Sequence, residues 1–278
     1  MLRTRLLTIA AIFPLFLLAL FYLPNRYWSG LILLFTIVAA HEWARLFDVS
    51  QVGSAWYGLA TAAIAALLCV DGGLLLPSDR VTQWLCVLAL IFWTVAAPFV
   101  LVRRAKISSK TLALVLGLIA LIPLWAALVK LRSFGPLYVF FSMGIIWLAD
   151  TAAYFVGRAF GKRKLVPDIS PGKTVAGAVG AIAIAIVYAL IFVALGQRFG
   201  TMSSAGLPML ILGFVVIVIL SIIGDLFESW LKRQQGKKDS GSLFPGHGGI
   251  LDRVDSLTST MPVVVLALMC CKSLWGIL

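Results

Sequence analysis

Acidic and basic side chains recur at helical spacing near the end of one apolar stretch. In "IIGDLFESWLKR", Asp225 is followed by Glu228 after three residues and Glu228 by Lys232 after four. Such spacings place side chains on one face of an α-helix. Asp252 and Asp255, in "LDRVD", repeat the three-residue spacing at the start of the next apolar stretch. Ionisable groups in apolar segments are energetically unfavourable and usually have a function.

Two polar motifs accompany these acids. Residues 237–256, "KKDSGSLFPGHGGILDRVDS", combine charges with glycines, which let backbone N–H groups approach anionic oxygens closely. Residues 170–174, "SPGKT", come directly before another apolar stretch, where the positive end of a helix dipole favours an anion. Asp150, in "IIWLADTAAYFVG", adds an acid toward the end of a further apolar stretch. Both motifs are therefore candidates for binding phosphate.

A pocket with both signs of charge suits a nucleoside triphosphate and a divalent metal ion. Mg²⁺ prefers oxygen ligands, commonly one or two carboxylates together with phosphate oxygens and water. Lys and Arg neutralise the remaining phosphate charge. The Walker pattern GxxxxGK[ST] is absent from the sequence, so we expect a phosphate site of another design. The alternative is that the acids only form interfacial ion pairs, but their concentration among cations and glycines favours a site.

The composition shows which kind of scaffold must position these residues. The chain has 278 residues, of which 62% are hydrophobic and 12% charged, so it is a membrane protein. Its net charge of +12 fits basic cytoplasmic loops and an anionic lipid surface better than nucleic acid, which we do not expect as a partner. The four cysteines lie in or beside apolar runs and are expected to be small core residues rather than disulfides or zinc ligands.

The fold class predicted is all-α, a polytopic membrane protein with about nine transmembrane helices and a polar site at the cytoplasmic face. Helices satisfy their own backbone hydrogen bonds in lipid. The start of the chain is expected to be a retained first helix rather than a cleaved signal peptide. The apolar runs lie at about 6–23, 28–47, 54–70, 81–102, 111–129, 136–156, 174–195, 207–228 and 257–277.

The distribution of Lys and Arg predicts the orientation. With a cytoplasmic N-terminus, the inside segments carry 17 of these residues and the outside segments 6. The positive-inside rule therefore favours a cytoplasmic N-terminus and an external C-terminus. No internal repeat or linker divides the chain, so we divide it by role: residues 1–140 form the N-terminal and middle transmembrane helices, and residues 141–278 form the catalytic transmembrane region with cytoplasmic loops.

The stretch from Ser229 to Asp255 resembles the signature of the phosphatidate cytidylyltransferase (CDP-diacylglycerol synthase) family. The matching residues are Ser229, Lys232, Arg233, Lys238, Asp239, His247, Gly248, Gly249, Asp252, Arg253 and Asp255. An upstream block is similar too, through Asp150, Tyr154, Gly157, Arg158, Gly161, Lys162, Ser170, Pro171, Lys173 and Thr174. The similarity covers roughly residues 145–258. Ala176 departs from it, where a larger polar residue is expected.

The resemblance implies an enzyme that transfers CMP from CTP to phosphatidate with Mg²⁺, giving CDP-diacylglycerol and pyrophosphate. It implies membrane lipids as partners and a bacterial inner-membrane location with a cytoplasmic active site; a homodimer and a second, monovalent cation are left open. The attacking lipid phosphate is already ionised, so positioning and charge neutralisation suffice.

Roles can then be assigned to the matched residues. We expect Asp225 and Asp252 to bind the metal, since each lies at a helix end facing the same loop, with Asp150, Asp239 and Asp255 as second choices. His247 is expected to donate a hydrogen bond to phosphate, although a loop histidine bonded to backbone is the alternative. The residues expected to contact phosphate or substrate are Ser170, Lys173, Thr174, Ser229, Lys232, Arg233, Lys238, Asp239, Gly248, Gly249 and Arg253.

Three alternatives are weaker. A CTP-dependent lipid kinase acting on a polyprenol or phytol would need a dominant general base for its hydroxyl acceptor, and none stands out. An ion or solute transporter would place its acids near the bilayer midplane, not at one face. His41, in "AAHEWARL", lacks the second histidine of HExxH, so we expect it to be interfacial, with Glu42 and Arg45 as a local ion pair.

Overall fold

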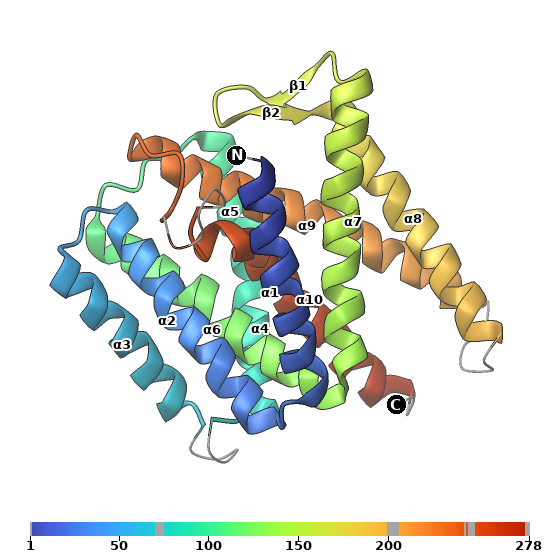
Figure 1. Ribbon diagram of the computed structural model, residues 1–278, viewed down its shortest axis with the longest axis horizontal. Helices are drawn as coiled ribbons and strands as arrows, with labels where there is room; N and C mark the ends of the chain where they lie inside the picture. The colour runs from blue at the N-terminus through green and yellow to red at the C-terminus, as the bar shows by residue number, and fades with distance from the viewer. Residues whose placement is uncertain (1, 70–74, 199–205, 242, 244–247, 276–278) are drawn as a thin grey trace.

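The computed structural model describes residues 2–69, 75–198, 206–241, 243 and 248–275, and these are mostly helical (Figure 1). A two-stranded hairpin connects α7 to α8. The elements are α1 (Leu2–Tyr22), α2 (Asn25–Leu46), α3 (Gln51–Leu67), α4 (Asp79–Ile91), the π-helical turn η1 (Phe92–Ala96), α5 (Ala97–Arg103), α6 (Lys110–Phe134), α7 (Pro136–Phe160), β1 (Lys164–Val166), β2 (Ser170–Thr174), α8 (Val175–Arg198), α9 (Leu207–Gln234) and α10 (Leu251–Trp275).

The all-α membrane fold is confirmed. Within the described residues, seven helices are long and apolar enough to cross a membrane, with α4, η1 and α5 counting as one continuous helix, Asp79–Arg103. The other two predicted spans fall on α1, where the apolar part is the shorter Ile12–Tyr22, and on α3, whose 17 residues are not among the seven. The number of nine crossings therefore stays a prediction.

The connections gather at two opposite ends of the helices (Figure 1). One end carries the loops after α2, α5 and α9 together with the hairpin between α7 and α8, and we call this end the polar face. Within the bundle α7 packs against α8, α9 against α10, and α2 against both α3 and α6. The acids and lysines singled out in the sequence occur mainly in segments that end or begin at the polar face.

Buried aromatic side chains hold the helices together. Trp28, Trp93 and Trp125 have exposed fractions of 0%, 2% and 0%. The Trp28 indole donates to Leu128 O at 3.2 Å, so its polar N–H is satisfied inside the bundle. Trp28 and Trp93 are therefore packing residues of the bundle interior.

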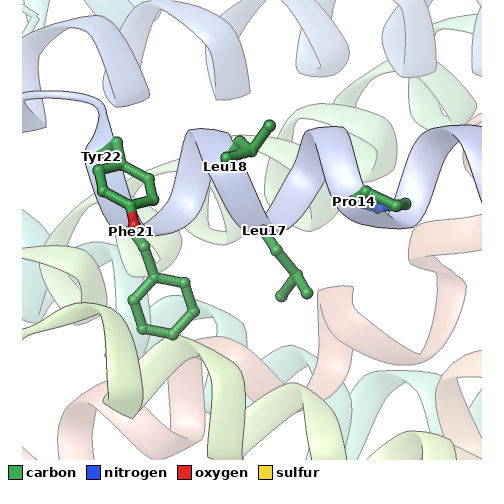
Figure 2. Close-up of a pocket in the computed structure, with 5 residues that line it drawn as sticks. All are labelled: Pro14, Leu17, Leu18, Phe21 and Tyr22. Carbon is green, nitrogen blue, oxygen red and sulfur yellow. The ribbon is translucent and has the colours of Figure 1, made fainter.

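The outer surface is apolar, as lipid contact requires. Figure 2 shows one part of it, an open hollow of about 590 Å³ along α1 that is lined by Pro14, Leu17, Leu18, Phe21 and Tyr22. Leu18, Phe21 and Tyr22 are all exposed. All the lining residues come from one helix, so this hollow is an irregularity of the lipid-facing surface and not a cleft between elements.

Candidate active site

A buried aromatic contact fixes the rotation of α9 about its axis. Phe227 has no exposed surface and meets the rings of Phe92 and Trp93 edge-to-face, with centroid distances of 5.5 and 5.4 Å. Edge-to-face pairs of this kind stabilise a specific orientation. Asp225 lies two residues before Phe227 and Glu228 directly after it. The packing of Phe227 therefore sets the directions in which these two acidic side chains leave α9.

The C-terminal end of α9 is held by the segment between α5 and α6. Gln234 Oε1 accepts a hydrogen bond from Ile107 N at 2.8 Å. Trp230 Nε1 donates to Ala105 O at 3.1 Å. These side chain–backbone bonds connect residues more than 120 positions apart (127 and 125). They hold the last turns of α9 at the polar face, where the charged residues of this helix lie.

The hairpin places a lysine over α9. Its antiparallel strands pair Lys164 with Thr174 and Val166 with Ser170. Lys173 Nζ lies 2.7 Å from Asp225 Oδ2, and this ion pair joins β2 to α9. Arg233, predicted to contact substrate, donates through Nε to the backbone of the hairpin turn at Ile169 O, 3.3 Å away. The structure thus brings "SPGKT" and "GDLFES" together, as their joint assignment to one site required.

Thr174 has a local task in this arrangement. Its Oγ1 accepts a hydrogen bond from Gly177 N at 3.0 Å, which is the N-cap interaction for α8. Only 6% of Thr174 is exposed, and Gly157 and Gly161 of the preceding segment also lie against its side chain. The hydroxyl oxygen thus caps α8, and the predicted phosphate contact of Thr174 stays a prediction. Ser170, at the start of β2, is half-buried.

A close helix crossing brings acids from α9 and α10 together. A Cβ on Gly224 would lie 2.5 Å from Ser259 Oγ and 2.7 Å from Asp255 O, so only glycine permits this approach. Ser259 Oγ in turn donates to Leu220 O at 2.8 Å. Asp225, the next residue on α9, is thereby placed near Asp255.

Three carboxylates from three helices form what we call the acid cluster: Asp150 of α7, Asp225 of α9 and Asp255 of α10. Asp150 and Asp255 each interact electrostatically with Asp225 and with Lys173. Asp225 also accepts a hydrogen bond from Ser229 Oγ at 3.2 Å. Asp150 is exposed and Asp225 is half-buried. Lys173 is the cation that these three acids share.

A second set of charges lies deeper. Lys232 Nζ is 2.7 Å from Asp252 Oδ1 and 3.2 Å from Glu228 Oε1, and all three side chains have exposed fractions of 12% or less. Neither carboxylate oxygen of Glu228 accepts a hydrogen bond within the described part of the chain. Lys232 was expected to contact phosphate or substrate. Its observed contacts are with two buried acids, so it is a structural counter-charge in this conformation.

Asp252 is saturated by donors from the protein. Besides the Lys232 pair, its Oδ2 accepts from Ser240 N at 2.9 Å, from Ser240 Oγ at 2.8 Å and from Gly249 N at 2.8 Å. The Gly249 amide, expected to bind phosphate, thus points at Asp252. Gly248 beside it adopts φ +79°, a left-handed conformation that favours glycine. Asp252 organises the loop that precedes α10, and the prediction that it binds metal stays a prediction.

The remaining predicted site residues are accessible. Arg233, Lys238, Asp239 and Arg253 are all exposed at the polar face. His247 lies outside the described residues. Among those described, no group of three or more His, Cys, Asp or Glu side chains lies together so that it could hold a metal ion. A metal ion here would have to complete its shell with substrate oxygens and water.

Sequence reasoning missed Glu42. The predicted ion pair between Glu42 and Arg45 is wrong: the Arg45 guanidinium donates to Val49 O at 2.9 Å, while Glu42 turns into the protein and is 6% exposed. Glu42 Oε2 accepts from Leu251 N at 2.9 Å, across a separation of 209 residues. A buried acid in a predicted span was the available signal, but its partner could not be found from local spacing.

The fold and site define a class: polytopic membrane proteins with paired acids and lysines at one face of the bundle. The sequence profile of the cytidylyltransferase family matches residues 3–271, and the chain belongs to this family. It is 38% identical over 270 residues to the phosphatidate cytidylyltransferase of Pseudomonas aeruginosa, covering 95% of each chain. It is 35% identical to that of Haemophilus influenzae, covering 94% of this chain and 96% of the relative. The Bacillus subtilis enzyme is 45% identical over 142 residues, half of each chain.

Proposed function

We propose that the protein transfers CMP from CTP to phosphatidate, forming CDP-diacylglycerol and pyrophosphate. The observation that carries the proposal is the convergence of the acid cluster and Lys173 at the polar face, from four segments spread between residues 150 and 255: "DTAAYFVG", "SPGKT", "GDLFES" and "LDRVD". Family membership and relatives named phosphatidate cytidylyltransferase support it.

The chemistry needs few special groups. An oxygen of the phosphatidate phosphate attacks the α-phosphorus of CTP, and the bond from that phosphorus to the oxygen bridging to the β-phosphate breaks. Pyrophosphate leaves with the electron pair of that bond. The nucleophile is already an anion at neutral pH, so the protein has to position two negatively charged phosphates against each other and neutralise their charge.

The described residues fit a divalent cation. The acid cluster holds three carboxylates that repel one another with Lys173 as their shared cation, and two of them, Asp150 and Asp225, are at least partly accessible. We propose that Asp225 would hold Mg²⁺ together with Asp150 or Asp255, a number of carboxylates typical for this ion. When bound, Mg²⁺ would neutralise phosphate charge. Asp252 is a weaker candidate because its oxygens already have partners.

Cationic side chains would hold the phosphates. Lys173 already lies at the acid cluster, where its ammonium would hold a phosphate oxygen of the substrate. Lys238 and Arg253 are exposed at the same face. Lys232 would act less directly, by keeping the charge of Asp252 and Glu228 balanced beneath the site.

A cavity that opens to the surface between the helices supports a lipid substrate. A cavity of about 680 Å³ lies between α1, α2, α6, α7 and α10. This is a typical volume for a small-ligand site. Its lining runs from Arg253 and Thr151, next to the signature residues, to Trp28 in the first turn of α2 at the opposite end of the bundle. We propose that it takes an acyl chain of phosphatidate, with the head group near Arg253.

Substituting cavity and surface residues in parallel tests this location. Leu124 lines the cavity and is 4% exposed, whereas Leu18 lines the open hollow of Figure 2 and is 55% exposed. Leu124→Phe should lower activity on long-chain phosphatidate more than on a short-chain analogue, and Leu18→Phe should change neither. Equal effects of Leu124→Phe on both chain lengths would remove the cavity from the proposal.

We also propose that the polar face is cytoplasmic, at a bacterial inner membrane. The 17-to-6 division of Lys and Arg supports this orientation, because the basic loops all belong to the polar face. A reporter that is active only outside the cytoplasm should be active when fused after Leu278 and silent when fused at Gly241. Activity at Gly241 would contradict both the orientation and access of CTP to the site.

The decisive experiment concerns the acceptor. Purified protein with CTP and Mg²⁺ should release pyrophosphate and form CDP-diacylglycerol only when phosphatidate is added. Diacylglycerol or a polyprenol should give no product. Release of CDP with a free alcohol would instead assign the protein to the lipid kinases.

A further inference from the structure

Glu42 connects the N-terminal half of the chain to the loop that enters α10. It belongs to α2, which contains none of the signature residues. Its Oε2 accepts the backbone N–H of Leu251, the first residue of α10, at 2.9 Å, and the carboxylate also accepts from the backbone of Ile250. A carboxylate inside a bundle is strongly unfavourable without such donors. The loop therefore stabilises the buried acid, and the acid fixes the loop.

Two glycines show how closely the loop surrounds this carboxylate. A Cβ on Gly241 would lie 2.4 Å from Glu42 Oε1, and one on Gly249 would lie 2.3 Å from Oε2. Contacts that short do not occur, so any larger residue would displace either the loop or the acid. Both arms of the described loop, before and after residues 244–247, thus lie against Glu42.

The contact continues into the site through one hydroxyl. Ser240 Oγ donates to Asp252 Oδ2 at 2.8 Å and lies 3.4 Å from Glu42 Oε2. Asp252 pairs in turn with Lys232 of α9. Glu42 is therefore at the base of a series of polar contacts that fixes the loop, the first turn of α10 and the end of α9 relative to one another.

We propose that Glu42 is a positioning residue of this enzyme: it holds the loop between α9 and α10 so that the exposed signature residues Lys238, Asp239 and Arg253 face the phosphates of CTP. The identity of the nucleotide rests on the proposed function, whereas the contacts of Glu42 do not. Displacing a positioned group by about 1 Å can lower the rate about 10²-fold. Lys238 and Asp239 do not line the acyl cavity, whereas Ile250 and Arg253 do, so displacing the loop should affect CTP more than phosphatidate.

The test compares Glu42→Gln with Asp48→Asn. Glutamine keeps the shape of Glu42 but replaces one acceptor oxygen with a donor, which confronts the N–H of Leu251. Asp48 lies two residues beyond the end of α2 and pairs with Lys237 of the same loop, but it is exposed and contacts no signature residue, so it is the control. In Glu42→Gln we expect faster amide exchange at Leu251, weaker binding of Mg²⁺–CTP and a kcat/KM for CTP lower by about 10- to 100-fold. The KM for phosphatidate should change by a smaller factor than the kcat/KM for CTP.

If Glu42→Gln does not fold, a second pair of variants still tests the proposal. Gly241→Ala places a methyl group against the Glu42 carboxylate, and Glu42→Asp withdraws that carboxylate by one methylene. Gly241→Ala alone should weaken CTP binding, and the double variant should recover part of the loss. Unchanged CTP binding in folded Glu42→Gln, or in Gly241→Ala, would overturn the proposal, as would losses that merely follow the folded fraction. CTP binding and amide exchange at Leu251 can be measured without turnover. If the wild-type protein binds CTP but leaves phosphatidate unchanged, the proposed acceptor is wrong and the role of Glu42 is unaffected.

Discussion

The acid cluster and the Asp252 loop both place carboxylates at the polar face, but they differ in what satisfies them. Asp225 shares Lys173 with Asp150 and Asp255, and its side chain is 34% exposed. Asp252 is 7% exposed at its side chain, and its oxygens accept from Lys232, Ser240 and Gly249. The three acids of the first group share Lys173, whereas both oxygens of Asp252 already have donors from the protein. An added cation would therefore stabilise the acid cluster, whereas the Asp252 loop already has its partners.

The largest effect on activity is expected from Asp225→Asn. The change keeps the volume but removes charge that would bind a cation, and losing one charge-stabilising contact typically lowers the rate about 10²–10³-fold. Stability should change by no more than about 1 kcal/mol, since the Lys173 pair is partly exposed and repulsion from the other acids is relieved. The measurement is specific activity across a Mg²⁺ titration alongside thermal unfolding in detergent. Asp168→Asn is the control. Asp168 lies in the hairpin turn and forms an exposed ion pair with Arg104, so this change should leave activity and stability unchanged.

Asp252→Asn should affect stability first. It leaves Lys232 with one fewer negative partner in a buried environment and turns an acceptor into a donor, so we expect destabilisation by about 1–3 kcal/mol. Activity should fall because the loop moves, and added Mg²⁺ should not restore it. Comparing the unfolding temperature and the Mg²⁺ dependence with those of Asp225→Asn sharpens the contrast. If Asp252→Asn is stable and high Mg²⁺ restores its activity, Asp252 is a metal ligand.

The spacing of residues along the sequence predicted the features that depend only on the geometry of a single helix. The apolar spans were recognised because a helix that crosses lipid needs about 20 apolar residues. The contact between Asp225 and Ser229 could also be found from spacing along the sequence, because residues four apart lie on the same face of a helix. Glu42 with Leu251 and Lys173 with Asp225 were not derivable this way. Those contacts depend on how α2, the hairpin and α9 pack, and spacing within one segment carries no information about packing between segments.

A third prediction concerns the hairpin that delivers Lys173 to the acid cluster. Thr174→Val keeps the shape but removes the N-cap of α8, which typically lowers stability by about 0.5–2 kcal/mol. Activity should fall several-fold, because Lys173 is the neighbouring residue. Thr174→Ser keeps the hydroxyl and should preserve both. If instead Thr174→Val is stable and only its affinity for CTP falls, the hydroxyl contacts phosphate as the sequence suggested.

The smallest effect is expected where the loop is held by an exposed contact. Lys237 Nζ donates to Arg45 O at 2.8 Å, to Leu46 O at 3.0 Å and to Asp48 Oδ1 at 2.8 Å. The hydrogen bond from Lys237 holds the pKa of Asp48 below its ordinary value. The ion pair is therefore intact at any pH above the ordinary pKa and is lost only as the pH falls through the lowered pKa. Lys237→Met should therefore change CTP kinetics by less than about three-fold, as exposed pairs contribute little. The same small ratio to wild type should hold between neutral and mildly acidic pH. A loss as large as that of Glu42→Gln would mean that Lys237 holds the loop in place as strongly as the buried acid does.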